Sequence, residues 1–244
     1  MPDMNKSKDQ EYYISRQSEI LALFDDFAQG WKPFILSRHG DDFAETILRE
    51  ARERLEALIP EIPYIGGDEN SMTRHLIRSV LNLALYQAMK ARGNTARETG
   101  QIVYDATVEY VKNHPFSPAQ PLSLEAIRTK REQAQESQER RYPGDWVWEF
   151  IEGAGQEFDY GYDFFECGTQ KLYHAQGADA FLPYYCFLDF VTTRKSGQTL
   201  IRSMTLATGD EKCDFRFKPA RTTEQAWPPP FPEETSDVLA RKTR

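Results

Sequence analysis

Several features that are scarce in this 244-residue sequence narrow the class of protein it encodes. It has 3 cysteines, an odd and widely spaced set that does not make the disulfide framework of a small secreted domain. No apolar run approaches the ~20 residues that a membrane-spanning helix needs. The first residues also lack the apolar segment of a signal peptide. We therefore expect a cytoplasmic protein with free thiols and no membrane partner.

Basic charge is scarce as well. The chain has 30 Lys and Arg against 38 Asp and Glu, a formal net charge of -8. Binding to nucleic acid requires clustered Lys and Arg to neutralise phosphates, and the Arg-rich segment 128–141 is diluted by Glu and Gln. We therefore expect no nucleic-acid partner. A hydrophobic content of 40% in a chain of this length instead indicates a globular protein with a sizeable core.

Apolar residues at helical spacing predict a helical region over residues 1–142. The first helix is expected over residues 9–29 and ends at Gly30. The second runs from Asp41 or Asp42, as its cap, to residue 59. The strongest covers residues 72–92 with Ser71 as its N-cap, and another begins at Thr95 and ends near residue 113. A polar helix over residues 123–140 is expected either to lie across the protein or to form an arm.

At residue 143 the pattern changes to the alternation that is typical of strands. Strands are predicted near residues 146–150, 158–164, 199–206 and 213–217. Two helices, over residues 165–176 and 178–195, separate the second strand from the third. We therefore predict an α+β fold, with about four antiparallel strands and helices on one face. Residues 143–220 are expected to form one compact unit with the helical region, followed by an extended or disordered proline-rich tail over 221–244.

Candidate reactive groups gather in residues 158–217, which contain every cysteine. Cys167 falls in the first turn of a predicted helix, where backbone N–H groups and the helix dipole lower a thiol pKa, although Glu166 opposes this. A buried packing role is the alternative. Cys213 and Asp214 are neighbours on a predicted strand and should point to opposite faces. His174 lies two helical turns from Cys167, roughly 10.5 Å, which is too far for a catalytic pair.

Cys186 and Asp189 are three residues apart on a predicted helix and so share a face. Aromatic neighbours indicate that this helix is buried, so the carboxylate must be paired or hydrogen-bonded. Arg202 lies on an apolar strand face and also needs an anion. That anion is either an internal carboxylate such as Asp189 or the carboxylate of a substrate, and the internal pair is the favoured interpretation.

Three thiols with neighbouring carboxylates raise the question of a metal site. The sequence has no Cys-x-x-Cys or His-x-x-x-His pair to anchor zinc. We therefore expect no cofactor, with zinc or another divalent metal as the alternative.

Four blocks of sequence follow one another in an order and with a spacing that point to one family. They are Asp163-Phe-Phe-Glu-Cys167-Gly, Pro183-Tyr-Tyr-Cys-Phe-Leu-Asp189, Leu200-Ile-Arg202 with Thr205-Leu-Ala-Thr-Gly209, and Cys213-Asp-Phe-Arg-Phe217. Together they resemble the L-2-amino-thiazoline-4-carboxylic acid hydrolase family, over roughly residues 63–218. The resemblance implies hydrolytic opening of a sulfur-containing five-membered ring that bears a carboxylate and an exocyclic amine.

This resemblance implies an enzyme with a small-molecule substrate. The chemistry that such a reaction needs makes Cys167, Cys186, Cys213, Glu166, Asp189 and Asp214 the catalytic candidates. A cysteine thiolate, or a water activated by a carboxylate, would attack the ring amidine carbon. The ring carboxylate would pair with Arg202 or Arg216, and Tyr162 and Asp163 are further substrate-binding candidates. The alternatives are a cyclase or isomerase of secondary metabolism and a non-catalytic small-molecule-binding module. A homo-oligomer is compatible with each of them.

Overall fold

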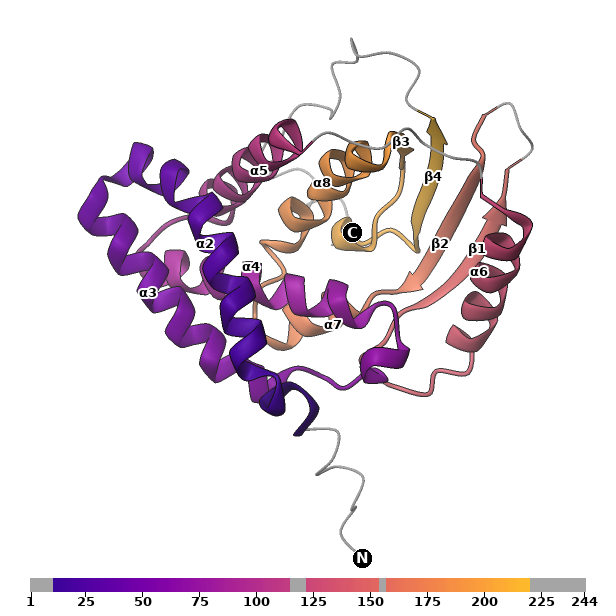
Figure 1. The fold of residues 1–244 in the computed structure, drawn as a ribbon, viewed down its shortest axis with the longest axis horizontal. Helices are drawn as coiled ribbons and strands as arrows, with labels where there is room; N and C mark the ends of the chain where they lie inside the picture. Colours follow the sequence, from indigo (N-terminus) through magenta and orange to yellow (C-terminus); the bar gives the residue numbers. More distant parts are fainter. Residues whose placement is uncertain (1–10, 115–121, 154–156, 220–244) are drawn as a thin grey trace, which may run out of the picture.

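The computed structural model describes residues 11–114, 122–153 and 157–219. The fold is α+β, as predicted, with a helical N-terminal half followed by an antiparallel sheet (Figure 1). The first half contains α2 (Gln17–His39), α3 (Asp41–Leu58), α4 (Thr73–Ala91) and α5 (Ala96–Asn113), with short 3₁₀ turns η1 (Ile59–Glu61) and η2 (Gly67–Glu69). Residues 11–15 are also helical. The tail expected over residues 221–244 lies outside the described residues.

Helix α2 is longer than predicted because it continues through Gly30 and Pro33. A glycine costs about 1 kcal/mol relative to alanine in a helix, and a proline removes one backbone hydrogen bond. Trp31 and Ile35 are 2% and 0% exposed, so this part of the helix is fixed in the core. The burial of these side chains offsets the two local losses, and the prediction that the helix ends at Gly30 is wrong.

The next three helices begin close to the predicted residues, but two of them do not have the predicted capping residue. Gly40, with φ +87°, precedes α3, so Asp41 is its first residue rather than its cap. Ser71 does not cap α4. Instead the Asn70 side chain accepts the backbone N–H of the residue just before the helix, at 2.8 Å. Helix α5 begins after Thr95, whose side chain takes part in a capping box, as the sequence indicated.

The C-terminal half contains strands β1 (Val147–Glu152), β2 (Tyr160–Glu166), β3 (Gln198–Ile201) and β4 (Cys213–Pro219). Within the described residues they form one antiparallel sheet in the order β1-β2-β4-β3, so that β2 and β4 join two hairpins. Helices α7 (Gly168–Ala175) and α8 (Leu182–Thr192) lie between β2 and β3 in sequence, and the short turn η3 (Thr193–Ser196) extends α8.

Two boundaries in this half differ from the prediction. Strand β2 continues through Glu166, so α7 begins at Gly168 and not at Phe165. Strand β3 ends at Ile201, while the chain beyond it forms a loop that contains the turn η4 (Leu206–Thr208). In β2, Glu166 still pairs with Val147 of β1, beyond the predicted end of the strand. In β3 the alternating pattern runs on past Ile201, the last residue that pairs with β4.

The strand register gives the sheet two chemically different faces. Tyr162 lies opposite Phe150 on one side and Phe215 on the other, so these rings share a face. This aromatic face consists of Trp148, Phe150, Tyr160, Tyr162, Phe164, Phe215 and Phe217. Phe187 and Phe190 of α8 pack against its β3–β4 end. The outer face carries Glu149, Asp163, Asp214 and Arg216.

The polar helix α6 (Leu124–Ser137) lies along β1 at the edge of the sheet (Figure 1). The Ser137 hydroxyl accepts the Trp148 backbone N–H at 3.1 Å and lies 3.1 Å from the Trp148 carbonyl, to which it can also donate. Gln138 donates to the same carbonyl at 2.8 Å. These bonds satisfy backbone groups that an edge strand would otherwise expose. Of the two arrangements predicted for this helix, it therefore lies across its own chain.

One hydrophobic cluster contains residues of both the helical half and the sheet half. The buried Tyr173 hydroxyl donates to the Ser79 carbonyl of α4 at 2.9 Å. Tyr86 of α4 stacks on Phe181, with ring centroids 4.6 Å apart. These contacts attach α7 and the start of α8 to α4. Among the described helices, none combines the length and apolar character required to cross a membrane.

Candidate active site

The three cysteines come from different elements and converge on one region. Cys167 precedes α7, Cys186 lies on α8, and Cys213 begins β4 on the aromatic face. The charge on either of the other two thiols raises the pKa of Cys186, so all three lie close together. Cys213 is 7% exposed, whereas Cys167 and Cys186 are partly accessible. The gathering of cysteines in the sequence therefore corresponds to a gathering in space.

Burial keeps these thiols protonated. Desolvation raises the pKa of Cys167 to about 11, although the backbone N–H groups at the start of α7 act in the opposite direction. Desolvation also raises the pKa of Cys186 and of Cys213. The helix-terminus effect expected at Cys167 is present but is outweighed by burial. None of the three thiols is thus activated as a thiolate at neutral pH.

Asp189 and Arg202 form an internal ion pair beside the thiols. Arg202 Nη1 donates to Asp189 Oδ2 at 2.8 Å, and Nη2 donates to the Cys186 carbonyl at 3.0 Å. The guanidinium lies 4.7 Å from the ring centre of Phe190 and 5.0 Å from that of Phe215. Only 5% of the Arg202 side chain is exposed. The internal pair favoured from the sequence is therefore confirmed, and Arg202 holds the Asp189 carboxylate in place.

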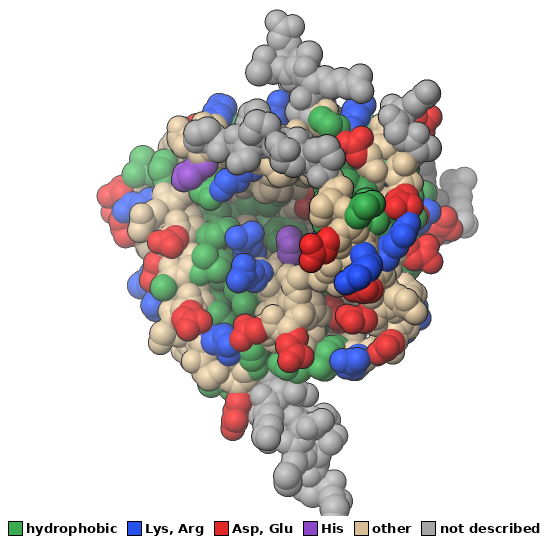
Figure 2. Space-filling model, turned by 45° about the vertical axis from the view of Figure 1, so that its right-hand side comes forward, with side chains coloured by type: hydrophobic (Ala, Val, Ile, Leu, Met, Phe, Trp, Pro, Cys, Tyr) green, Lys and Arg blue, Asp and Glu red, His purple; other side chains and the backbone are tan. Residues whose placement is uncertain are grey.

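Asp189 opens into a cleft that also contains His75 of α4. Desolvation raises the pKa of Asp189 despite Arg202, yet 40% of its side chain is accessible. His75 is likewise exposed, but the protein around it lowers its pKa by desolvation. Groups that are both accessible and desolvated lie in a concavity. The charge of Asp189 raises the pKa of His75, and the charge of His75 lowers that of Asp189. Figure 2 shows a hollow with hydrophobic walls and with basic and histidine side chains at its margin.

Aromatic hydroxyl groups border the same region. Tyr185 of α8 is partly accessible, and its pKa is raised by burial and by the charges of Asp189 and two thiols. Tyr162 of the aromatic face is also partly accessible, with a pKa that burial raises. Both tyrosines are therefore protonated at neutral pH and can donate a hydrogen bond to a ligand.

Asp163, Asp214 and Arg216 lie away from the cleft, on the outer face. Burial alone would raise the pKa of Asp163, but hydrogen bonds from Arg216 and Lys212, each 2.7 Å long, outweigh it and lower the pKa. Asp214 Oδ1 accepts the backbone N–H groups of the loop after β3, at 2.8 and 2.6 Å. As predicted, Cys213 and Asp214 point to opposite faces. These charged groups stabilise the sheet and its loop.

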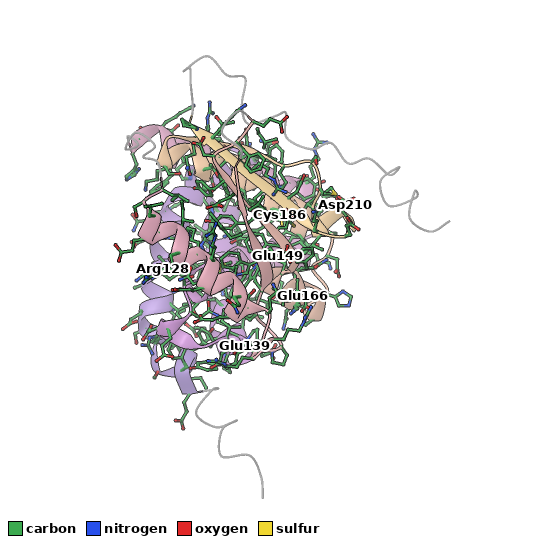
Figure 3. All side chains as sticks on the ribbon, turned by 90° about the vertical axis from the view of Figure 1, so that its right-hand side faces the viewer. Arg128, Glu139, Glu149, Glu166, Cys186 and Asp210 are labelled. Carbon is green, nitrogen blue, oxygen red and sulfur yellow. The ribbon has the colours of Figure 1, made fainter. Side chains whose placement is uncertain are left out.

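Glu166 is also separated from the central cluster. It accepts hydrogen bonds from Lys171 at 2.6 Å and from Arg140 at 2.8 Å, and these two bonds lower its pKa. In the side view of Figure 3, Glu166 lies well apart from Cys186. His174, which the sequence placed too far from Cys167 for a catalytic pair, is exposed and bonded to Asp179 at 2.9 Å.

His75 was not among the residues predicted from the sequence. It belongs to a helix with a clear apolar stripe, and its partner Asp189 lies far away in the chain, so local spacing gave no signal. The only available sign was its position on the polar side of a helix whose other faces are buried. In the part of the chain that the structure describes, no group of three or more His, Cys, Asp or Glu side chains is arranged to hold a metal ion.

The protein is an α+β protein whose cleft is bordered by apolar walls and a few convergent polar groups, features that are typical of small-molecule sites. A family model described as L-2-amino-thiazoline-4-carboxylic acid hydrolase matches residues 73–217, more than half of the chain. The protein belongs to this family, as the four sequence blocks indicated. The matched range includes both His75 and Asp189. The search of curated proteins and that of solved structures each gave no match.

Proposed function

We propose that the protein hydrolyses the ring of a small, carboxylated cyclic amidine in the cleft between α4, α8 and the aromatic face. Family membership supports a hydrolase acting on a small molecule. The observation that carries the proposal is the accessible carboxylate of Asp189, held by Arg202 and facing His75. A cationic amidine would pair with this carboxylate, and its arrival would favour the ionised form of Asp189.

In this proposal His75 acts as the base. Because desolvation lowers its pKa, the imidazole is neutral at pH 7 and able to accept a proton. It takes a proton from water as the water oxygen bonds to the amidine carbon. The ring C–S bond then breaks, its electron pair remains on sulfur, and the proton held by His75 passes to that sulfur. The products are a free thiol, an open-chain urea and the proton that the cationic amidine brought, which is released to water; together they contain the atoms of substrate and water.

Attack by water is favoured over attack by a cysteine. With a pKa of about 11, roughly one Cys167 thiol in ten thousand is ionised at pH 7. Cys186 is ionised even less, because its pKa is raised well above the ordinary value. Both thiols then serve as apolar or weakly polar parts of the cleft wall. Their inert state equally favours the second candidate function, a binding module that does no chemistry.

The test is turnover of L-2-amino-thiazoline-4-carboxylate by the wild type, His75→Gln and the three single Cys→Ala variants, with folding checked by circular dichroism. We expect His75→Gln to lose roughly a hundredfold or more in kcat, and each cysteine variant to stay within a few fold. Complete loss in one folded cysteine variant would instead indicate thiolate attack. Binding without turnover by the wild type would indicate the binding module.

A further inference from the structure

The carboxylate of the substrate needs a cation, and the two arginines that the sequence suggested for it are occupied. The charge of Arg78 acts on His75 and Tyr185, so this arginine lies at the end of the cleft where the amidine would react. Arg202 is bonded to Asp189 and to a backbone carbonyl, and only 5% of its side chain is exposed. Arg216 is bonded to Asp163 on the outer face. Neither guanidinium is placed to receive a ligand in the cleft without losing its internal partner.

Lys130 of α6 has a different environment. Its ammonium group lies 5.4 Å from the ring centre of Tyr162, on the aromatic face. Among the described residues, no carboxylate lies within ion-pair distance of it. The surrounding protein partly desolvates this amine, and desolvation lowers its pKa. A desolvated charge in a folded protein ordinarily has an acidic partner, so the ring alone leaves the ammonium group short of an anion.

The position of Lys130 relative to Asp189 follows from the strand register. Tyr162 on β2 lies directly opposite Phe215 on β4, and neighbouring strands are about 4.8 Å apart. Lys130 lies over the first of these rings, and Arg202, which holds Asp189, lies over the second. A cation and a carboxylate therefore face the same aromatic surface from adjacent positions. This spacing suits a small molecule with an anion at one end and a cation at the other.

We infer that Lys130 binds the carboxylate of the substrate and gives the site its preference for carboxylated rings. The inference rests on the proposed function, in which the amidine end of the same molecule pairs with Asp189. It assigns to α6 a direct part in the site, because the helix that covers the β1 edge also supplies the anion-binding side chain. Tyr162 would lie beneath the bound ring and contact its face.

The experiment compares the wild type with Lys130→Met and with Lys90→Met as the matched control. Lys90 also lies over a tyrosine ring, at 5.7 Å from the centre of Tyr86, but it is exposed and far along α4. Kinetics are measured with L-2-amino-thiazoline-4-carboxylate and with 2-amino-thiazoline, which lacks the carboxylate. Calorimetry with L-thiazolidine-4-carboxylate and with thiazolidine measures binding independently of catalysis.

For Lys130→Met we expect KM for the carboxylated substrate and Kd for L-thiazolidine-4-carboxylate to rise roughly tenfold to a hundredfold. The kcat of Lys130→Met should stay near that of the wild type, as should its KM for 2-amino-thiazoline and its Kd for thiazolidine. For Lys90→Met, kcat and every KM and Kd should stay near the wild-type values. Normal turnover with an unchanged KM in Lys130→Met would overturn the inference and leave the proposed function intact. Carboxylate binding that depends on Lys130, without turnover by the wild type, would support the inference and overturn the proposed function. A wild type that neither binds nor turns over these rings would overturn both.

Discussion

The side chain of Arg202 shows how the protein keeps an ionised carboxylate beside an apolar cleft. Its guanidinium lies near the Phe190 and Phe215 rings, and its N–H groups are directed to Asp189 and a carbonyl oxygen. A buried guanidinium requires such partners because its charge would otherwise be costly. The pair therefore fixes the direction of the Asp189 carboxylate and leaves part of it accessible for a ligand.

We expect Arg202→Met to lower the free energy of unfolding by about 2 kcal/mol, because it leaves Asp189 desolvated without a partner. This value lies below that for a fully buried pair since Asp189 is partly exposed. The double variant Arg202→Met/Asp189→Asn should recover part of the loss. Urea unfolding of the two single variants and the double variant measures the coupling. Strictly additive changes would contradict a stabilising interaction between the two side chains.

Thiol reactivity tests the electrostatics of the cysteine cluster. Because burial raises the pKa of all three cysteines, we expect each to react with a maleimide at pH 7 at least tenfold more slowly than free cysteine. Mass spectrometry of the labelled protein over time would identify the modified positions. A single cysteine that reacts faster than free cysteine would contradict this account and revive nucleophilic catalysis.

His75 should make stability depend on pH in one direction. Its folded pKa is lowered, so the unfolded chain takes up the proton first as the pH falls below about 6.5. The contribution of neutral His75 to the free energy of unfolding is fully present above pH 6.5 and declines towards pH 5. We expect His75→Gln to unfold with a smaller loss of stability between pH 7 and 5 than the wild type. Equal slopes for His75→Gln and the wild type would contradict desolvation at His75.

At the scale of elements, the sequence predicted those segments in which the local pattern and the core agree. Helices α4 and α5 and the succession of strands along the chain followed from apolar periodicity, and the Thr95 cap marked the start of α5. Helix α2 did not, because the burial of Trp31 and Ile35 overrides the helix-breaking tendency of Gly30 and Pro33. Strand β3 was overextended, because alternation continues after pairing with β4 has stopped.

Strand and helix periodicity also predicted part of the site. The spacing of Cys186 and Asp189, with the side of the strand on which Arg202 lies, correctly indicated an internal ion pair. The same reasoning could not find His75, because helix α4 meets α8 only in the folded protein. The strand register decides which candidates lie together, and alternation within β2 alone does not show that Asp163 and its partners lie on the opposite face from Cys213.

The attachment of α6 to β1 gives a prediction at this scale. Removing the Ser137 hydroxyl by Ser137→Ala should cost about 1 kcal/mol of unfolding free energy and speed hydrogen exchange of the Trp148 amide. Ser123→Ala, which removes the N-cap at the other end of α6, should cost a similar amount without the local change at Trp148. Unaltered exchange at Trp148 in Ser137→Ala would show that the hydroxyl does not hold this edge.

At the scale of the whole molecule, the cleft lies between the two halves of the chain. The helical half contributes His75, whereas α8 and the sheet contribute Asp189 and the aromatic face. Direct contacts between the halves, such as the Tyr173–Ser79 hydrogen bond, keep these groups at fixed positions. In the proposed mechanism, the helical half therefore supplies the base, His75, as well as structural support.

Turnover of L-2-amino-thiazoline-4-carboxylate by Asp189→Asn, compared with Asp163→Asn, tests whether the Asp189 carboxylate binds the amidine of the substrate. Both aspartates form ion pairs with an arginine, but only Asp189 opens into the cleft. We expect the wild type and Asp163→Asn to be active if folded, and kcat/KM of Asp189→Asn to fall roughly a hundredfold or more. A folded Asp189→Asn variant with the activity of the wild type would contradict the account.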